Sequence, residues 1–403
     1  MSGFTRLLGG AMLALVAASA AIAALPAVVH TQQELRALLD TGTPTPLDAL
    51  TPYGKRRFLG QLTWGAKGLG GFGYTPLVRE LDRTQLEAVL RFLDSGSYLP
   101  VLGKDMAGPP LRLPAPSTDV ARRLEQLEQF AAEDASRRAD SVAPITALGA
   151  PAVLQRYRDL FGERMDTAAL KTQPRGDLFS LFDAAVVAAN ANPDAEAFDH
   201  LLLVHYELTA RGIDTRRTLD RSVLNAMLAA RRFEQAGAFA AARPQLADSA
   251  IPLVVDKLGP GFQDRSVYDY DAAANTLTRR AVAYPAGTEL LMVVGAGCHF
   301  SRNALQAIAA DTALQARLRQ ANLMLITPPH AAIAFGFIAD WNAAHPTLPI
   351  RIPAHAQEWQ GIDVLGVPEF HVLKDGKVIG KQSGWPDQGN KAAVVGLVEA
   401  AGH

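Results

Sequence analysis

The pattern of apolar and polar positions predicts a mainly helical first part of the chain and a last third in which strands and helices alternate. Amphipathic helices are predicted at residues 84–93, 119–138, 152–163, 178–191, 194–211, 215–232 and 233–242. From about residue 266, strands are predicted at 276–283, 289–294, 322–327 and 349–352 and in a hairpin at 366–380. Further helices are predicted at 301–320, 331–344 and 391–400. This order predicts a mixed α/β sheet with helices on both faces, preceded by a mainly α-helical region.

A proline-rich segment separates the predicted helical domain from the residues before it. Residues 108–118 (GPPLRLPAPST) contain four prolines and are typical of a linker. We therefore expect a mixed, partly helical region at 24–107, a helical domain at 119–250 and the α/β domain at 266–403. The segment 224–246 is similar to half of a tetratricopeptide hairpin, but no second copy follows at a spacing of about 34 residues. An irregular helical domain is the preferred interpretation.

The start of the chain predicts a secretory signal peptide at residues 1–23. Arg6 is the only charge before an unbroken run of small and apolar residues, and Ala-x-Ala cleavage sites lie near residues 21–23. The alternative is an uncleaved membrane anchor, because the run is nearly long enough to span a bilayer. We expect cleavage and a periplasmic or secreted protein, with a membrane contact only if the segment is retained.

Charge and cysteine content narrow the classes of function. Lys+Arg 39 and Asp+Glu 40 give a formal net charge of -1, which argues against a nucleic-acid partner. The single cysteine excludes an intramolecular disulfide and a zinc site of several thiolates. In the oxidising compartment that export implies, this cysteine is either inert or kept for chemistry with another molecule.

Two further patterns favour ordinary structure over a ligand site. Gly68, Gly70 and Gly73 match the literal G-x-G-x-x-G pattern, but no convincing strand precedes them, so we interpret the segment as a flexible surface loop. His200 and His205 are five positions apart on a predicted helix, whereas a metal-binding pair needs a spacing of about three or four. We expect neither a metal nor a cofactor.

Three features of the last third occur together. The buried strand at 289–294 runs into Cys298 at the start of a long helix, a Val-Pro loop lies at 366–370, and a Lys-Asp-Gly-Lys hairpin is followed by Gly384. In this order they resemble the thioredoxin-like superfamily over residues 266–403. The resemblance implies a proline in the cis form that faces the active cysteine. It also implies an inserted segment around 328–360, as in exported branches of that superfamily.

The positions that differ from the superfamily pattern are those that carry its thiol chemistry. The second cysteine of C-x-x-C is replaced by Ser301, which gives C-x-x-S, and Gly297 stands where a tryptophan usually precedes the first cysteine. The stretch 291–293 is apolar, where thioredoxins often bury an acid. A mixed disulfide on the single cysteine could not be resolved within the chain, so an external thiol would be needed.

The leading hypothesis is monothiol thiol–disulfide exchange through Cys298. A helix N-terminus favours the thiolate, His299 and Ser301 are expected to tune it, and Val367 and Pro368 are expected to bind an extended protein substrate. A protein or a small thiol or disulfide is the expected partner. The alternative is a non-catalytic module, in which Cys298 is a relic and the fold and the helices bind a protein.

Overall fold

The structure is a computed structural model that describes residues 28–65, 68–140, 150–192, 196–247, 250–282, 288–362, 366–386, 388–400 and 402. The predicted signal peptide at 1–23 lies outside these residues. Of the helices in the described ranges, none combines the length and apolar composition needed to cross a bilayer.

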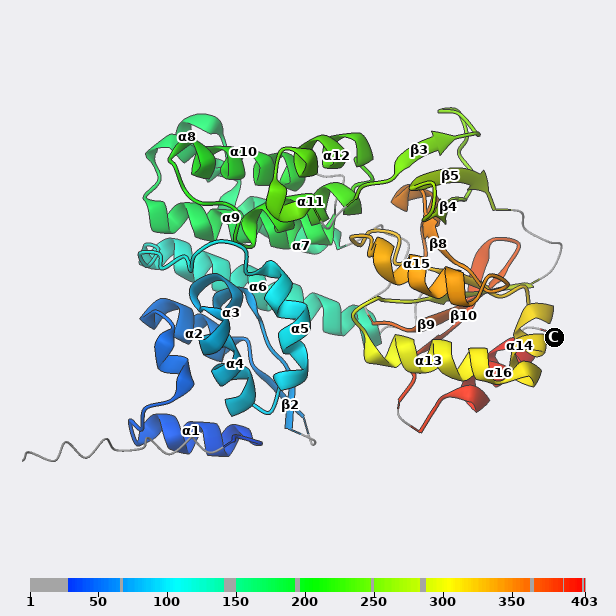
Figure 1. Cartoon of the computed structure of the whole chain (residues 1–403), viewed down its shortest axis with the longest axis horizontal. Coiled ribbons are helices and arrows are strands. Elements are labelled where there is room, and N and C mark those ends of the chain that lie inside the picture. Colours follow the sequence, from blue (N-terminus) through cyan, green and yellow to red (C-terminus); the bar gives the residue numbers. More distant parts are fainter. Residues whose placement is uncertain are drawn as a thin grey trace, which may run out of the picture.

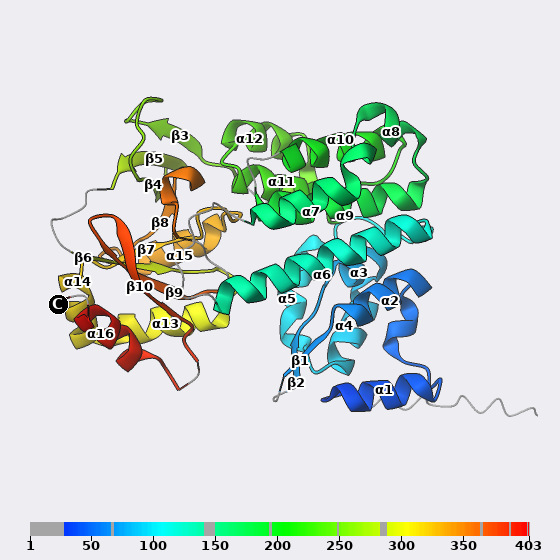
Figure 2. The ribbon, with the colours of Figure 1, turned by 180° about the vertical axis from the view of Figure 1, so that it is seen from behind.

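Three units follow one another along the chain (Figure 1). The N-terminal unit (28–105, blue to cyan) and the helical unit (118–247, cyan to green) lie on top of one another, and the sheet unit (250–402, green to red) lies beside them. Figure 2 shows the long helix α6 (Thr118–Asp140) running between the N-terminal unit and the other helices. The proline-rich segment 108–117 has no helix or strand and joins the first two units.

The N-terminal unit is built of short helices and one hairpin. Local capping explains its sharp helix starts: Asp82 accepts a hydrogen bond from the backbone N–H of Gln85, and the Gln85 side chain accepts one from the N–H of Asp82. Its elements are α1 (Gln32–Asp40), η1 (Pro46–Ala49), α2 (Pro52–Gly60), β1 (Thr63–Gly65), β2 (Gly68–Gly71), α3 (Thr75–Glu80), α4 (Arg83–Phe92), η2 (Gly96–Tyr98), α5 (Leu99–Leu102) and η3 (Gly103–Asp105).

The helical unit packs around α9 (Arg175–Ala191), which is buried along most of its length. An alanine-rich sequence lets neighbouring helices approach it closely. The other elements are α7 (Pro151–Phe161), η4 (Gly162–Arg164), α8 (Thr167–Thr172), α10 (Glu196–Ala210), α11 (Leu219–Ala229), α12 (Phe233–Ala241) and η5 (Pro244–Leu246).

The sheet unit contains a mixed eight-stranded sheet in the order β10-β9-β6-β7-β8-β4-β5-β3. Its strands are β3 (Leu253–Asp256), β4 (Ser266–Asp271), β5 (Thr276–Ala281), β6 (Thr288–Val293), β7 (Met324–Ile326), β8 (Ile350–Pro353), β9 (Glu369–Lys374) and β10 (Lys377–Ser383). Its helices are α13 (His299–Ala310), α14 (Thr312–Gln320), α15 (Phe335–Ala344), η6 (Ala356–Trp359) and α16 (Lys391–Ala400). Strands β6, β7 and β8 run parallel, and β9 pairs antiparallel with β6.

Several elements differ from the sequence-based expectations. The sheet begins at β3, before residue 266, because this exposed edge strand lacks the apolar pattern of a buried one. The helix expected at 301–320 is two helices, since the side chain of Asp311 caps α14 by accepting from the N–H of Leu314. The glycine-rich segment is the antiparallel hairpin β1–β2 rather than a loop, and it does not form a βαβ unit. The segment around 328–360, where an insertion was expected, contains α15, β8 and η6.

The prediction of helices on both faces of the sheet is wrong for one face. Helices α13 to α16 contribute to the cluster on the face of Leu290 and Met292. The opposite face buries Leu291 and Val293 in a smaller cluster whose described members come from strands, η6 and loops, among them Trp359. Strand β6 is buried on both faces and therefore needs apolar cover on both. On the face of Leu291 and Val293, the indole of Trp359 is part of that cover.

Candidate functional site

The sheet register brings the two predicted halves of the site together. Val293 at the end of β6 pairs with Glu369 at the start of β9 in an antiparallel ladder. The turn after β6 therefore lies beside the loop before β9, although the two are about 70 positions apart in the sequence. The peptide bond between Val367 and Pro368 is cis, as the resemblance implied.

Cys298 lies at the N-cap of α13 and is half-buried. Its Sγ donates a hydrogen bond of 2.9 Å to the carbonyl oxygen of Val367. The unpaired N–H groups at the start of a helix favour negative charge on a nearby group. The thiol thus lies at the N-terminal end of α13 and donates its hydrogen bond to the loop before β9.

Gly295 permits this close contact. A Cβ at this position would lie 2.5 Å from Cγ2 of Val367, which is closer than real side chains pack. The other side of the loop is held by the N–H of Gly384, which donates to the carbonyl oxygen of Pro368 at 2.8 Å. Backbone on both sides therefore fixes the Val367–Pro368 loop against the cysteine turn.

The described contacts of Ser301 and His299 are with residues other than Cys298. Ser301 is fully buried, and its Oγ accepts a hydrogen bond from the N–H of Gly295 at 3.1 Å. It orders the turn, and no hydrogen bond joins it to Cys298 among the described residues. His299 is exposed and its ring lies 3.8 Å from that of Phe300, centroid to centroid. An exposed aromatic pair next to the thiol offers a contact surface instead.

A buried polar cluster under the proline loop was missed by the sequence analysis. Glu369 and His371 are each 1% exposed, and Oε2 of Glu369 lies 3.0 Å from Nε2 of His371. Lys381 Nζ and Ser383 Oγ each lie 2.9 Å from Oε1 of the same carboxylate. The available signal was the alternation of polar residues at 369 and 371, two positions apart on a strand that is otherwise buried.

The surroundings of Glu369 favour the ionised form of its carboxylate. Burial alone would raise the pKa of Glu369, but the hydrogen bond and charge of His371 and of Lys381 outweigh it and lower that pKa. Nδ1 of His371 is buried without a hydrogen-bond partner. Glu369 directly follows Pro368 in the chain, so this buried polar cluster lies next to the loop that contacts Cys298.

The two histidines of the helical unit are structural. Nδ1 of His200 lies 3.0 Å from the hydroxyl of Tyr157, and Nε2 of His205 lies 2.8 Å from Oδ1 of Asp220. The described residues contain no group of three or more His, Cys, Asp or Glu side chains arranged to hold a metal ion.

Comparisons with known proteins add little to this geometry. No protein-family model and no curated protein sequence matches the chain. Solved structures that resemble it include an uncharacterized thioredoxin-like protein from Porphyromonas gingivalis, with 12% identity, 35% of this chain and 93% of that chain covered, and a TM-score of 0.26. A thioredoxin-like protein from Bacteroides caccae has 14% identity, 62% and 84% coverage and a TM-score of 0.23. The chain is thus a mixed α/β protein with a large mixed sheet and many helices.

Proposed function

We propose that the protein is an exported member of the thioredoxin-like superfamily and that Cys298 carries out monothiol thiol–disulfide exchange. The observation that carries the proposal is the contact of the Cys298 thiol with the backbone of the Val367–Pro368 loop at the start of α13. A relic cysteine has no need of a glycine that opens this approach, yet Gly295 provides one. The start of the chain, where Arg6 precedes an uncharged apolar run, supports export.

The proposed reaction needs one external thiol. The Cys298 thiol loses its proton, and the thiolate attacks one sulfur of a substrate disulfide, so that a new S–S bond forms as the old one breaks and the second substrate sulfur leaves as a thiolate. That thiolate takes up a proton. An external thiolate, from a small-molecule thiol or a second substrate cysteine, then attacks the mixed disulfide and releases Cys298. Disulfide bonds are exchanged with no net oxidation.

The Val367 carbonyl has two roles in this scheme. While Cys298 is protonated, the carbonyl accepts a hydrogen bond from its thiol and so holds the sulfur beside the loop. Once the thiolate forms, the carbonyl is free to accept a hydrogen bond from a backbone N–H of an extended substrate beside the loop. His299 and Phe300, both exposed, would contact the same substrate.

Adduct trapping tests the proposal. The purified protein is incubated with a peptide that carries a glutathione mixed disulfide, and adducts are measured by mass spectrometry. We expect one adduct on the wild-type protein and none on Cys298→Ala. Gly295→Ala keeps the cysteine but pushes Val367 away from it. We therefore expect the exchange rate to fall by roughly tenfold or more. If no adduct forms, and a thiol reagent reacts with Cys298 no faster than with free cysteine, the exchange function is refuted.

The alternative function is partner binding by the helical unit. It is favoured by an open groove of about 590 Å³ beside α10, where Tyr206 is 73% exposed and lies close to Leu202, Leu203 and Arg243. If the wild-type protein forms an adduct that Cys298→Ala loses, this groove is an additional binding surface. If no adduct forms, partner binding at this groove becomes the main proposed function.

A further inference from the structure

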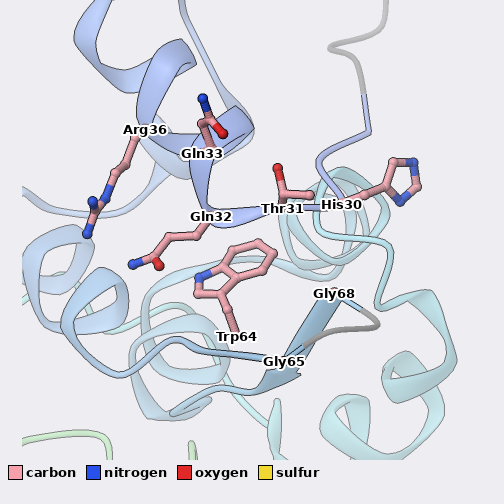
Figure 3. Close-up of a pocket in the computed structure, with 8 residues that line it drawn as sticks. All are labelled: His30, Thr31, Gln32, Gln33, Arg36, Trp64, Gly65 and Gly68. Atoms are coloured by element: carbon pink, nitrogen blue, oxygen red, sulfur yellow. The ribbon is translucent and has the colours of Figure 1, made fainter.

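A pocket in the N-terminal unit is separate from the cysteine site and has no role in the proposed function. It has a volume of about 710 Å³. Figure 3 shows the side chains that line it, which come from the start of α1 and from the β1–β2 hairpin.

The floor of the pocket is an indole ring presented by the glycine-rich hairpin. Part of Trp64 packs against the core of the N-terminal unit, and the rest lies in the pocket below Gln32 and Thr31 (Figure 3). Gly68, with φ +110°, packs so closely that a Cβ would lie 3.2 Å from the carbonyl oxygen of His30. Gly65 and Gly68, the described hairpin residues that line the pocket beside Trp64, have no side chain that could cover the indole there.

The wall of the pocket carries planar polar groups that are free to bind a ligand. Gln32 and Arg36 are four residues apart on α1 and share one face of the helix. Among the described residues neither side chain has a hydrogen-bond or ion-pair partner. Thr31 and Glu34 cap the helix end reciprocally, so the pocket does not depend on an open helix terminus. Among the described residues that line the pocket there is no Asp or Glu, and Arg36 carries the permanent charge.

We propose that this pocket binds an acidic carbohydrate, with a sugar ring stacked on Trp64 and its carboxylate paired with Arg36. The C–H groups of a pyranose ring are attracted to the electron-rich face of an indole. Guanidinium binds carboxylate in a planar two-bond geometry, and the amide of Gln32 can both donate to and accept from hydroxyls. A proline-rich peptide would also stack on the indole, but it has few hydroxyl or N–H groups to match this polar wall.

The test follows the indole of Trp64 directly. The chain has 4 tryptophans, so the ¹⁵N–¹H indole resonance of Trp64 can be assigned with Trp64→Phe and followed during titration. The probes are tetragalacturonate, maltotetraose as the matched neutral saccharide, and a proline-rich decapeptide. We expect tetragalacturonate to shift this resonance, and calorimetry to show roughly tenfold weaker binding in both Trp64→Ala and Arg36→Gln. Arg56→Gln, which removes an exposed arginine of α2 that does not line the pocket, should bind as the wild type does.

Each other outcome overturns the proposal or a defined part of it. An unmoved Trp64 resonance at up to roughly 10 mM tetragalacturonate rules out the site, as does full affinity in a folded Trp64→Ala variant. Equal binding of maltotetraose, unchanged by Arg36→Gln, would refute the acidic character of the ligand. A shift with the decapeptide alone would assign the pocket to peptides. None of these results depends on Cys298.

Discussion

The two junctions between the three units of the molecule are built from opposite kinds of interaction. The N-terminal unit has its own core, around Phe58, Leu86 and Phe92, and meets the helical unit through buried charges. The helical unit and the sheet unit instead share one continuous apolar cluster. The first junction should therefore depend on the ionisation of particular groups, and the second on packing.

The charged junction centres on Asp183 of α9. Arg79 donates two hydrogen bonds to its carboxylate, at 2.7 and 3.0 Å, and Arg57 pairs with both Asp183 and Glu128. Burial alone would raise the pKa of Asp183, but Arg79 and Arg57 outweigh it and lower that pKa. Arg217, 2% exposed, adds hydrogen bonds to backbone carbonyls of the N-terminal unit.

The apolar junction centres on Phe233 at the start of α12 and Tyr268 on β4. Their rings meet edge to face with centroids 5.5 Å apart, and both are nearly buried. Arg231 reinforces the contact through hydrogen bonds to the carbonyl oxygens of Pro329 and Pro353. The helices beside the sheet thus complete its core.

Removing the charge at the first junction should have the largest effect. In Asp183→Ala, two buried guanidinium groups lose their common partner, and we expect the free energy of unfolding to fall by about 3–5 kcal/mol. Hydrogen exchange should rise first in α2 and α3, while β6 and β9 stay protected. Asp119→Ala is the matched control, because it removes an exposed aspartate with three arginine partners and should have a much smaller effect. Equal loss of protection in the sheet would contradict the separation of the cores.

Truncating the apolar junction should destabilise two units together. In Phe233→Ala, the lost ring leaves a cavity against Tyr268, and we expect a loss of roughly 3 kcal/mol. Because the cluster is continuous, denaturation followed in the helical unit and in the sheet should shift by the same amount. Separate transitions for the two units would show that their shared core is not cooperative.

Lowering the pH should reduce the stability of the second junction by a smaller amount than these substitutions do. Burial, with the nearby charges of Arg138 and Arg231, lowers the pKa of His330 to about 4. Between a pH of about 6.5 and 4 the unfolded chain takes up a proton there that the folded chain does not, so stability falls as the pH falls through this window. His330→Gln should flatten this part of the stability–pH curve. An unchanged slope in that variant would place the titrating group elsewhere.

Much of the element pattern could be predicted from local sequence. The helices of the helical unit and the strands β6, β7 and β9 follow apolar periodicity, which a single chain displays without any knowledge of its partners. Strand β4 (Ser266–Asp271) and the hairpin β1–β2 were missed, because alternating Tyr and Asp in the first and glycines in the second give no strong strand signal. These elements form only because neighbouring segments pair with them.

The candidate site was predictable only in part. The position of Cys298 at a strand-to-helix turn follows from local pattern. The buried role of Ser301 does not, since it depends on which way the turn folds. The pairing of Glu369 with Lys381 depends on the β9–β10 register, which side-chain packing decides.

The sequence by itself determined that one cysteine is available, that it precedes a helix, and that a strand-rich third follows a helical middle. The tertiary structure decided what lies next to that cysteine, which cores merge, and where buried charges find partners. The physical reason is the distance along the sequence over which each interaction acts. Periodicity and capping involve residues a few positions apart, whereas Cys298 and Val367 are brought into contact only by the β6–β9 ladder.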